Sequence, residues 1–520
     1  MKTTITLVLG VLLAGAMPGQ RPAPNQDTLT RIIDRIVAGE QDFLKRLARY
    51  QPVLETYLQE APEAGGAPTD HYLLGKLLFD GEVAHTEFTS SAAFRKRKGG
   101  GSAFSAIGFA QMVILDGEDF SRQTYDFEFI RREFLGDLRC LAFDVAPKDK
   151  KAAGLFVGRV WVEDQDYRIV RFNGTYSHSK PSAVFLHFDS WRAPAGPGFF
   201  APAFVYIEDE GARGRLKGQT RLWGYNVARR GRLDELTGIK VEADKAVRDE
   251  SGSQDISPVE SHRSWTRQAA ENVIQRLERS ALLAPQGEVE RVLNTVTNNL
   301  IVTNEINLEA QCRVLLTTPL ETFSIGHTIV VSRGLLDVLP DEPSLAMVLA
   351  DELAHIVLGH RTETRFAFSD QTMFAETETI QRLRLARSPQ EVEAANRKAV
   401  EILSRSPYKD KLSSAGLFLK ALHSRAARFP NLIQANLGNR LASASNLVRL
   451  GELEQQAPPL EDDKIEQIAA LPLGSRIKLD SWTNQLTLIK AKPVALLSPR
   501  EKMPFEVTPV LIPLTRPAAR

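Results

Sequence analysis

Hydrophobic residues recur every three or four positions between Thr28 and Leu58, a spacing that predicts an N-terminal helical segment over residues 27–62. From about Thr124 the period changes to two, and turn-rich segments separate the short alternating runs. The runs that predict strands are 127–129, 140–145, 156–162, 167–172, 184–188, 204–207 and 220–225. Consecutive strands joined by short turns indicate an antiparallel β-domain, a curved sheet or half-barrel, over residues 68–248.

A second domain is predicted over residues 262–450, where helical periodicity returns after a polar linker. Within it, residues 328–332 are rich in β-branched side chains and predict a short strand, and residues 334–336 begin a helical turn. An apolar helix should follow, capped by Asp341, with Pro343 in its first turn and Gly359 near its end. Residues 451–520 predict a linker, a small hairpin and a proline-rich tail.

The composition is that of an ordinary globular protein, with 43% hydrophobic and 25% charged residues in a chain of 520. A net charge of +1 argues against a nucleic-acid-binding protein, which normally carries an excess of positive charge. The basic run at residues 95–98 is therefore interpreted as a solvated loop. Cys140 and Cys312 lie far apart in the chain, and we expect two buried thiols rather than a disulfide.

The first sixteen residues have the pattern of a secretion signal. Lys2 supplies the positive charge, residues 5–13 form a short apolar core, and residues 14–16 are the small residues of a cleavage site. No later segment is apolar over the length of a membrane helix, so we expect no transmembrane helix after signal removal. The chain is therefore predicted to be exported, into the periplasm or the extracellular space.

The predicted apolar helix carries the five residues with the clearest chemical meaning, D-E-L-A-H at 351–355. In the H-E-x-x-H signature of zinc metallopeptidases, two histidines four residues apart share one helix face and bind zinc. The glutamate between them acts as general base on a zinc-bound water. Here Glu352 and His355 stand at the positions of base and second ligand, and Asp351 replaces the first histidine.

Residues 322–336 and 345–360 resemble the zinc endopeptidase family of the CAAX prenyl proteases, which includes HtpX and BepA. The shared features are a strand, a G-L-L segment and H-E-L-x-H-x-x-x-x-H, whose last histidine matches His360. The resemblance covers about residues 262–450. It implies a mainly helical, gluzincin-type metallopeptidase-like domain with a small sheet. The whole chain is thus predicted to be α+β and multidomain.

The family takes its third zinc ligand from the glutamate of an E-x-x-x-D motif on a later helix, and two alignments of that motif remain open. In the first, Glu391 is the ligand and Ala395 stands where the aspartate is expected. In the second, Val392 occupies the ligand position and Asn396 the position of the aspartate. Residues 434–437 stand where the family has a T-H-P-like segment.

Two functions follow from the altered motif. Zinc accepts aspartate oxygen as well as histidine nitrogen, so an active metalloendopeptidase would use Asp351, His355 and Glu391 as zinc ligands and Glu352 as base. His360 and Asn396 would then lie just outside the ligands. The other function is a pseudopeptidase or weakly active peptidase in envelope protein quality control. Both functions imply protein or peptide partners.

The β-domain resembles the half-barrel of the lipoprotein carrier LolA, on the strand pair at residues 154–176. The concave face of such half-barrels holds acyl chains, which implies a lipid or lipoprotein partner. Five apolar residues are candidates for that groove: Phe156, Val160, Ile169, Phe172 and Phe188. The alternative is that these side chains pack against the N-terminal helix.

Overall fold

A computed structural model describes most of both predicted domains. The described residues are 26–61, 68–80, 82–87, 106–116, 119–177, 186–196, 198–211, 214–226, 258–361, 380, 383, 385–433, 437–442, 449–461 and 477–488. The predicted signal segment, the basic run, the proline-rich tail and residues 434–436 lie outside this set. Within it, no helix is both long and apolar enough to cross a membrane.

The first half of the chain forms one antiparallel sheet of ten strands in the order β3-β2-β1-β10-β9-β8-β7-β6-β5-β4. Apart from β1 and β10, every two strands that pair are consecutive in the chain, which confirms the predicted meander; β3 and β4 are the edge strands. The strands are β1 (Val53–Ala61), β2 (Thr69–Asp80), β3 (Glu82–Glu87), β4 (Tyr125–Leu135), β5 (Leu138–Pro147), β6 (Phe156–Glu163), β7 (Ile169–Tyr176), β8 (His187–Gly196), β9 (Phe199–Gly211) and β10 (Gly214–Trp223).

The helix predicted to run through Leu58 is shorter than expected. Helix α1 spans Gln26–Leu47, and the chain then enters strand β1. Leu54 and Leu58 pack on the α1 side of the sheet, whereas Val53 and Tyr57 pack on the other side. Because both faces of β1 are buried, the strand lacks the apolar–polar alternation that would have revealed it.

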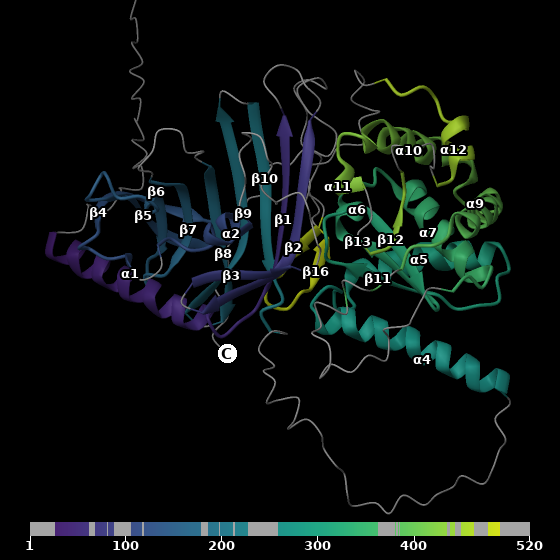
Figure 1. Cartoon of the computed structure of the whole chain (residues 1–520), viewed down its shortest axis with the longest axis horizontal. Coiled ribbons are helices and arrows are strands. Elements are labelled where there is room, and N and C mark those ends of the chain that lie inside the picture. Colours follow the sequence, from purple (N-terminus) through teal and green to yellow (C-terminus); the bar gives the residue numbers. More distant parts are fainter. Residues whose placement is uncertain are drawn as a thin grey trace, which may run out of the picture.

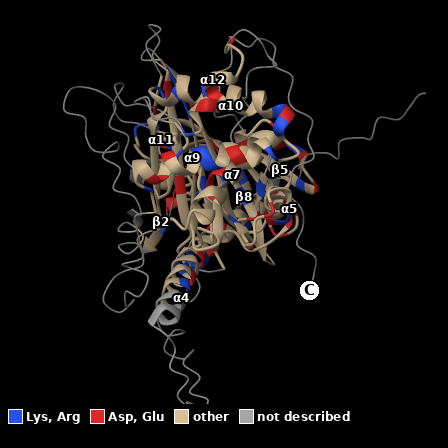
Figure 2. Cartoon of the chain, turned by 90° about the vertical axis from the view of Figure 1, so that its right-hand side faces the viewer, with Lys and Arg blue, Asp and Glu red and all other residues tan. Residues whose placement is uncertain are grey.

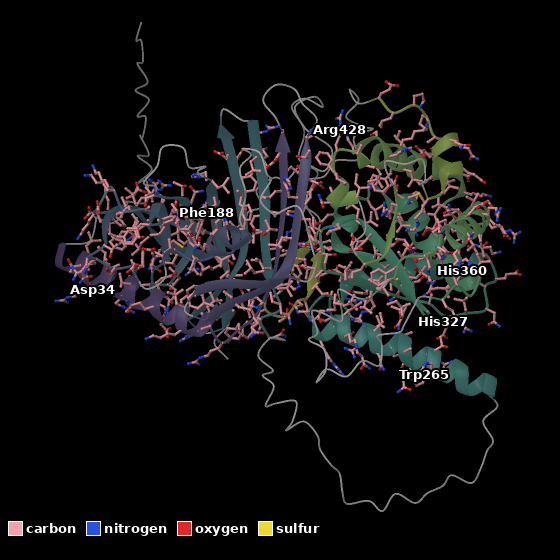
Figure 3. The ribbon with its side chains drawn as sticks, viewed as in Figure 1. Asp34, Phe188, Trp265, His327, His360 and Arg428 are labelled. Carbon is pink, nitrogen blue, oxygen red and sulfur yellow. The ribbon has the colours of Figure 1, made fainter. Side chains whose placement is uncertain are left out.

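Helix α1 and the short helix α2 (Ala106–Gln111) lie against one face of the sheet, as Figure 1 shows for α1 along its lower side. Apolar residues of α1 and of residues 109–120 form a continuous cluster with the sheet. The five candidate groove residues all belong to this cluster and are almost completely buried: Phe156, Val160, Ile169, Phe172 and Phe188. Phe188 lies inside the sheet-bearing half in Figure 3.

The second half packs helices around a four-stranded sheet in the order β11-β13-β12-β14. Strand β12 is antiparallel to both of its neighbours, and β11 is parallel to β13. The elements are α4 (Pro258–Arg279), α5 (Glu288–Thr303), β11 (Gln311–Leu315), β12 (Glu321–Ile325), β13 (Thr328–Ser332), α6 (Arg333–Val338), α7 (Glu342–Val357), α9 (Pro389–Ser404), α10 (Leu412–Ala426), α11 (Pro430–Ile433), β14 (Asn439–Arg440) and α12 (Gly451–Gln456).

The sequence predicted several local features of this half correctly. Strand β13, the turn that starts α6, and α7 lie where the pattern placed them. The Asp341 carboxylate accepts a hydrogen bond from the Ser344 amide at 2.9 Å and caps α7, and Gly359 has a left-handed φ of 70° just beyond its end. The predicted hairpin is β15 (Ile477–Leu479) with β16 (Leu486–Leu488).

The two halves share one hydrophobic core, because aromatic side chains of the sheet lie in the same cluster as apolar residues of α4, α5 and α7. Two buried carboxylates reinforce this junction. Glu55 of β1 accepts hydrogen bonds from Thr318 and lies 3.6 Å from the guanidinium of Arg333. Asp70 of β2 accepts hydrogen bonds from the backbone amides of Asn431 and Leu432. The β-domain and the helical half are therefore joined by packing and by buried polar contacts.

We predict that Glu55→Ala lowers the free energy of unfolding by about 3–5 kcal/mol, because it leaves the Arg333 guanidinium buried without its carboxylate. Urea unfolding followed by circular dichroism measures the loss. The control is Glu393→Ala, which breaks an exposed ion pair with Arg397 and should change stability little. Equal effects of the two substitutions would contradict a stabilising role for the junction carboxylate.

Candidate functional site

Helix α7 presents Asp351, Glu352 and His355 inside the second half of the chain, and all three side chains are fully buried. Most residues of α7 are apolar and buried, so the helix is enclosed by the domain rather than lying on its surface. It packs against α9, α10 and α5 and against strand β12. Asp351 and Glu352 are therefore held away from water and need partners.

Glu352 receives hydrogen bonds from the neighbouring sheet and from the C-terminal part of the chain. Its Oε1 accepts from the Thr322 hydroxyl of β12 at 2.7 Å, from the Arg449 guanidinium at 2.9 Å and from the Asn439 amide of β14 at 3.4 Å. Burial raises the pKa of Glu352, and the hydrogen bond from Thr322 opposes that rise. One oxygen of the candidate base is thus already engaged by three donors.

Arg449 brings a positive charge to both acidic residues of the motif. Its Nη2 contacts a carboxylate oxygen of Asp351 as well as Glu352, and its Nη1 donates to the Thr322 hydroxyl at 2.8 Å. Burial lowers the pKa of Arg449 to about 9, so the side chain remains charged at neutral pH. The guanidinium therefore lies between Asp351 and Glu352 as a buried counter-ion for both.

His355 contacts a histidine just beyond the end of its helix. Its Nδ1 lies 2.9 Å from Nδ1 of His360, a half-buried residue (Figure 3). Burial and the nearby positive charge of Arg387 lower the pKa of His355 to about 3, so the imidazole is neutral. Its Nε2 is buried and has no hydrogen-bond partner among the residues that the structure describes. Arg387 itself donates to the Ser324 carbonyl and hydroxyl, and its backbone amide donates to Asn439.

Glu391 lies at the start of α9 and caps that helix. Its Oε2 accepts from the backbone amide and the hydroxyl of Ser388, at 3.0 and 2.9 Å. Burial alone would raise the pKa of Glu391. The Ser388 hydrogen bonds and the charge of Arg387 outweigh burial, so the pKa is lowered. In the other alignment, Val392 and Asn396 are half-buried on the same helix. The charge of Glu391 acts on His355, but Oε2 of Glu391 is already engaged by Ser388, and Val392 carries no carboxylate.

These residues do not fit a catalytic zinc ion, which requires three protein ligands and a water. Asp351 is in contact with the Arg449 guanidinium, and His355 stands at the position of the second histidine of the motif. The third position is either Glu391, held by hydrogen bonds at its own helix start, or Val392, which has no donor atom. Among the described residues, no group of three or more His, Cys, Asp and Glu side chains could hold a metal ion.

Three residues of this site could not be recognised from the motif. Arg449 lies 97 residues beyond Glu352, and Arg387 and Asn439 follow the motif at intermediate distances. Each lies outside the D-E-x-x-H segment and outside any regular spacing. The sequence offered one indication, which is that Asp351 replaces the histidine on a helix predicted to be buried. A buried carboxylate requires a positively charged partner, but the sequence does not say which residue provides it.

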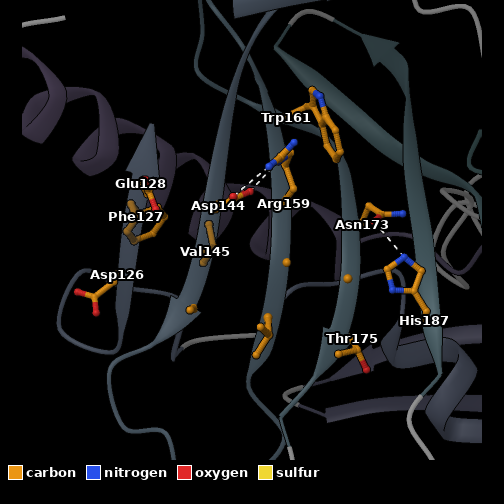
Figure 4. A pocket seen from close by; sticks show the side chains of 14 residues that line it. Asp126, Phe127, Glu128, Asp144, Val145, Arg159, Trp161, Asn173, Thr175 and His187 are labelled. Atoms are coloured by element: carbon orange, nitrogen blue, oxygen red, sulfur yellow. Dashed lines mark hydrogen bonds and ion pairs between the residues drawn. The ribbon is translucent and has the colours of Figure 1, made fainter. Parts of the chain in front are cut away.

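A separate cavity of about 630 Å³ lies on the sheet, on the face opposite α1 (Figure 4). Val157, Arg159 and Trp161 line it and alternate along β6 with the buried candidate groove residues. Arg159 and Asp144 form a two-point ion pair in this cavity at 2.6 and 3.0 Å. The cavity thus has charged side chains beside apolar ones and is distinct from the buried face that the LolA resemblance singled out.

The comparisons with known proteins agree with the geometry of the second half. The model of peptidase family M48 matches residues 286–400, from before α5 into α9. No curated protein sequence matches the chain. Similar solved structures include a LolA superfamily protein from Nitrosomonas europaea (12% identity, TM-score 0.20, 37% of this chain and 94% of that chain). Another is a DUF1329 family protein from Desulfovibrio piger (12% identity, TM-score 0.21, 37% of this chain and 92% of that chain).

The M48 match contains Asp351, Glu352, His355 and Glu391, and it stops before β14 and Arg449. The matched region thus contains Asp351 and Glu352 but not Arg449, which contacts both. M48 peptidases are in general zinc metallopeptidases, so the match concerns the scaffold on which such chemistry is built. Residues 286–400 are similar to peptidase family M48, as the segment around D-E-L-A-H predicts.

Proposed function

We propose that this protein is a pseudopeptidase, an exported protein that binds protein or peptide clients in envelope quality control without cleaving them. The single observation that carries the proposal is the contact of the Arg449 guanidinium with both Asp351 and Glu352. The Arg449 guanidinium lies beside both carboxylates. A peptidase would use Asp351 to bind a metal ion and Glu352 to activate a water. The metallopeptidase scaffold is then retained for binding.

The state of Glu352 supports the same proposal. A general base must reach the water that it deprotonates and must have a pKa suited to accepting that proton. Oε1 of Glu352 accepts hydrogen bonds from Thr322, Asn439 and Arg449, and the last of these is positively charged. Burial raises the pKa of Glu352, but the three donors already occupy this oxygen, so it is not free to accept a proton from a water.

Protein clients are favoured over a lipid ligand for the β-domain. The candidate acyl-binding residues are buried beneath α1, and α1 is held by an ion pair between Glu40 and Arg192 of β8 at 2.6 Å. On the end of the molecule that carries α9, α10 and α12, acidic and basic residues are interspersed (Figure 2). This end therefore lacks the cluster of basic residues that attracts an anionic membrane.

An active zinc peptidase is the second candidate, and one observation favours it. Nε2 of His355 and Oε2 of Glu352 are buried and lack hydrogen-bond partners among the described residues. These are the atom types that bind zinc or activate a zinc-bound water. For this function, Arg449 would have to leave Asp351 and a third ligand would have to be supplied.

We predict that the protein, purified without a metal-affinity tag, retains far less than one zinc per chain and does not cleave unfolded casein. Elemental mass spectrometry measures the zinc, and gel electrophoresis measures the cleavage. His355→Ala is the control, because it should leave both results unchanged in a pseudopeptidase. One zinc per chain that is lost on His355→Ala, together with cleavage of casein, would refute the proposed function and support the peptidase.

Glu391→Ala gives an independent prediction. If Glu391 serves as a helix cap, its removal should lower the free energy of unfolding by about 1 kcal/mol and leave the metal content unchanged. Chemical denaturation measures the first effect and elemental analysis the second. Ser388→Ala removes the other half of the same cap and should have a similar effect. A fall in bound zinc specific to Glu391→Ala would instead identify this residue as a ligand.

A further inference from the structure

We propose that an apolar groove beside the first turn of α7 binds an extended segment of a client protein, in which a few apolar side chains are flanked by a lysine or an arginine. The groove has a volume of about 440 Å³ and lies between α5, α6, the start of α7 and strand β16. The inference rests on the proposed function, because it identifies where the clients of that function bind and what chemistry they present.

The first support is the apolar surface that the groove exposes. Most of its lining side chains are apolar, and two of them, Val292 of α5 and Leu488 of β16, are 43% and 38% exposed. Leu345 of α7 lines the same groove and is half-buried. Exposed apolar residues are normally scattered singly over a protein surface, and their concentration in one groove marks a binding surface. A partner that covers these side chains removes apolar area from water, which favours binding.

The second support is that hydrogen bonds fix the walls of the groove. The Ile477 amide of β15 donates to Asp337 of α6 at 3.1 Å, and the Gly224 amide, just after β10, donates to the Asn484 side chain at 2.8 Å. These bonds hold the hairpin of β15 and β16 where the sheet-bearing half meets the helical half (Figure 1). On the other side of the groove, α5 packs against α7. The groove is therefore already formed, so a ligand need not order its walls on binding.

The third support is the charge at one end of the groove. Among the described residues that line it, the charged ones are Asp341 and Glu342, and both are acidic. The Asp341 carboxylate is engaged in the cap of α7, where it accepts from the amide and the hydroxyl of Ser344. Glu342 is exposed, and the Tyr408 hydroxyl donates to its Oε1 at 2.8 Å, which helps to hold the carboxylate in place. An acidic group beside an apolar groove favours a partner that carries a cation next to its apolar residues.

The groove is also separate from the altered motif. Glu342 begins α7, and Asp351 follows it by nine residues. At a rise of about 1.5 Å per residue, these positions are about 14 Å apart along the helix axis. A segment held by Val292, Leu488 and Glu342 would therefore bind whatever the state of Asp351 and Glu352, as binding without cleavage requires.

The experiment titrates the full-length protein into a fluorescently labelled peptide and records the fluorescence anisotropy. The peptide has the sequence Lys-Leu-Val-Leu-Lys with blocked termini, and its counterpart has glutamate in place of both lysines. We expect the lysine peptide to bind about tenfold more tightly than the glutamate peptide at low salt, because Glu342 attracts one and repels the other. High salt should reduce that difference, since the charges lie at an exposed end of the groove.

Matched variants test whether the peptide occupies the groove. Val292→Ser should weaken binding of the lysine peptide about fivefold, since it removes apolar surface that the peptide would cover. The control is Val302→Ser on the same helix, which should leave the affinity unchanged because Val302 is 74% exposed but lies outside the groove lining. Glu342→Gln keeps an acceptor for Tyr408 without the charge, and it should weaken binding of the lysine peptide about threefold. Leu488→Ser provides the apolar test on β16 if Val292→Ser does not fold.

The outcomes distinguish this inference from the proposed function. Equal affinity of the native protein and the Val292 and Leu488 variants, or a preference for the glutamate peptide, would overturn the groove as a client site and leave the pseudopeptidase proposal unaffected. Mass spectrometry of the peptide after the titration tests that proposal separately, because cleavage products would refute it even if the variants located binding on the groove. A fluorescent fatty acid that binds in place of both peptides, and binds less well to Val292→Ser, would show that the groove takes a lipid and would overturn the inference. Self-association that Val292→Ser abolishes, without binding of either peptide, would overturn it in favour of a second copy of the chain.

Discussion

The pairing of two buried carboxylates with one guanidinium is the interaction on which the second half of this structure depends. Helix α7 is buried because most of its residues are apolar, and Asp351 and Glu352 are carried into the interior with it. An isolated buried charge is far costlier than the whole stability margin of a typical domain. The arrangement of β12, β14 and the start of α12 around Arg449 is therefore a consequence of where α7 places its acids.

The same constraint bears on how a metallopeptidase-like scaffold would fold without a metal, as the proposed function requires. In a zinc enzyme, the metal ties the ligand helices together and contributes directly to folding. Loss of a histidine ligand would normally leave the remaining polar groups buried and unsatisfied. In the proposed pseudopeptidase, Arg449, from a segment beyond the M48-like region, would provide the compensating charge, and the helix packing could be kept without a metal.

Local patterns predicted the elements whose signals lie within a few neighbouring residues. The cap at Asp341, the strand at 328–332, the G-L-L turn and the paired strands around Gly158 were all evident because capping, alternation and turn chemistry act at short range. Strand β1 was mistaken for helix because both of its faces are buried. Arg449 was not foreseen because its role comes from a contact across 97 positions, which no periodicity reports. The two alignments of the third ligand could not be separated for the same reason.

The core shared by the two halves has a consequence for the order in which the chain matures. Tyr57, Tyr72 and Trp223 of the sheet pack against the helical half, which is synthesised later. The ribosome completes the ten strands before the residues that cover this face exist. Until α4, α5 and α7 arrive, the sheet presents an aromatic surface to its surroundings, and such surfaces are the usual targets of chaperones. A protein proposed to act in envelope quality control would thus itself need a chaperone until its helical half has been synthesised.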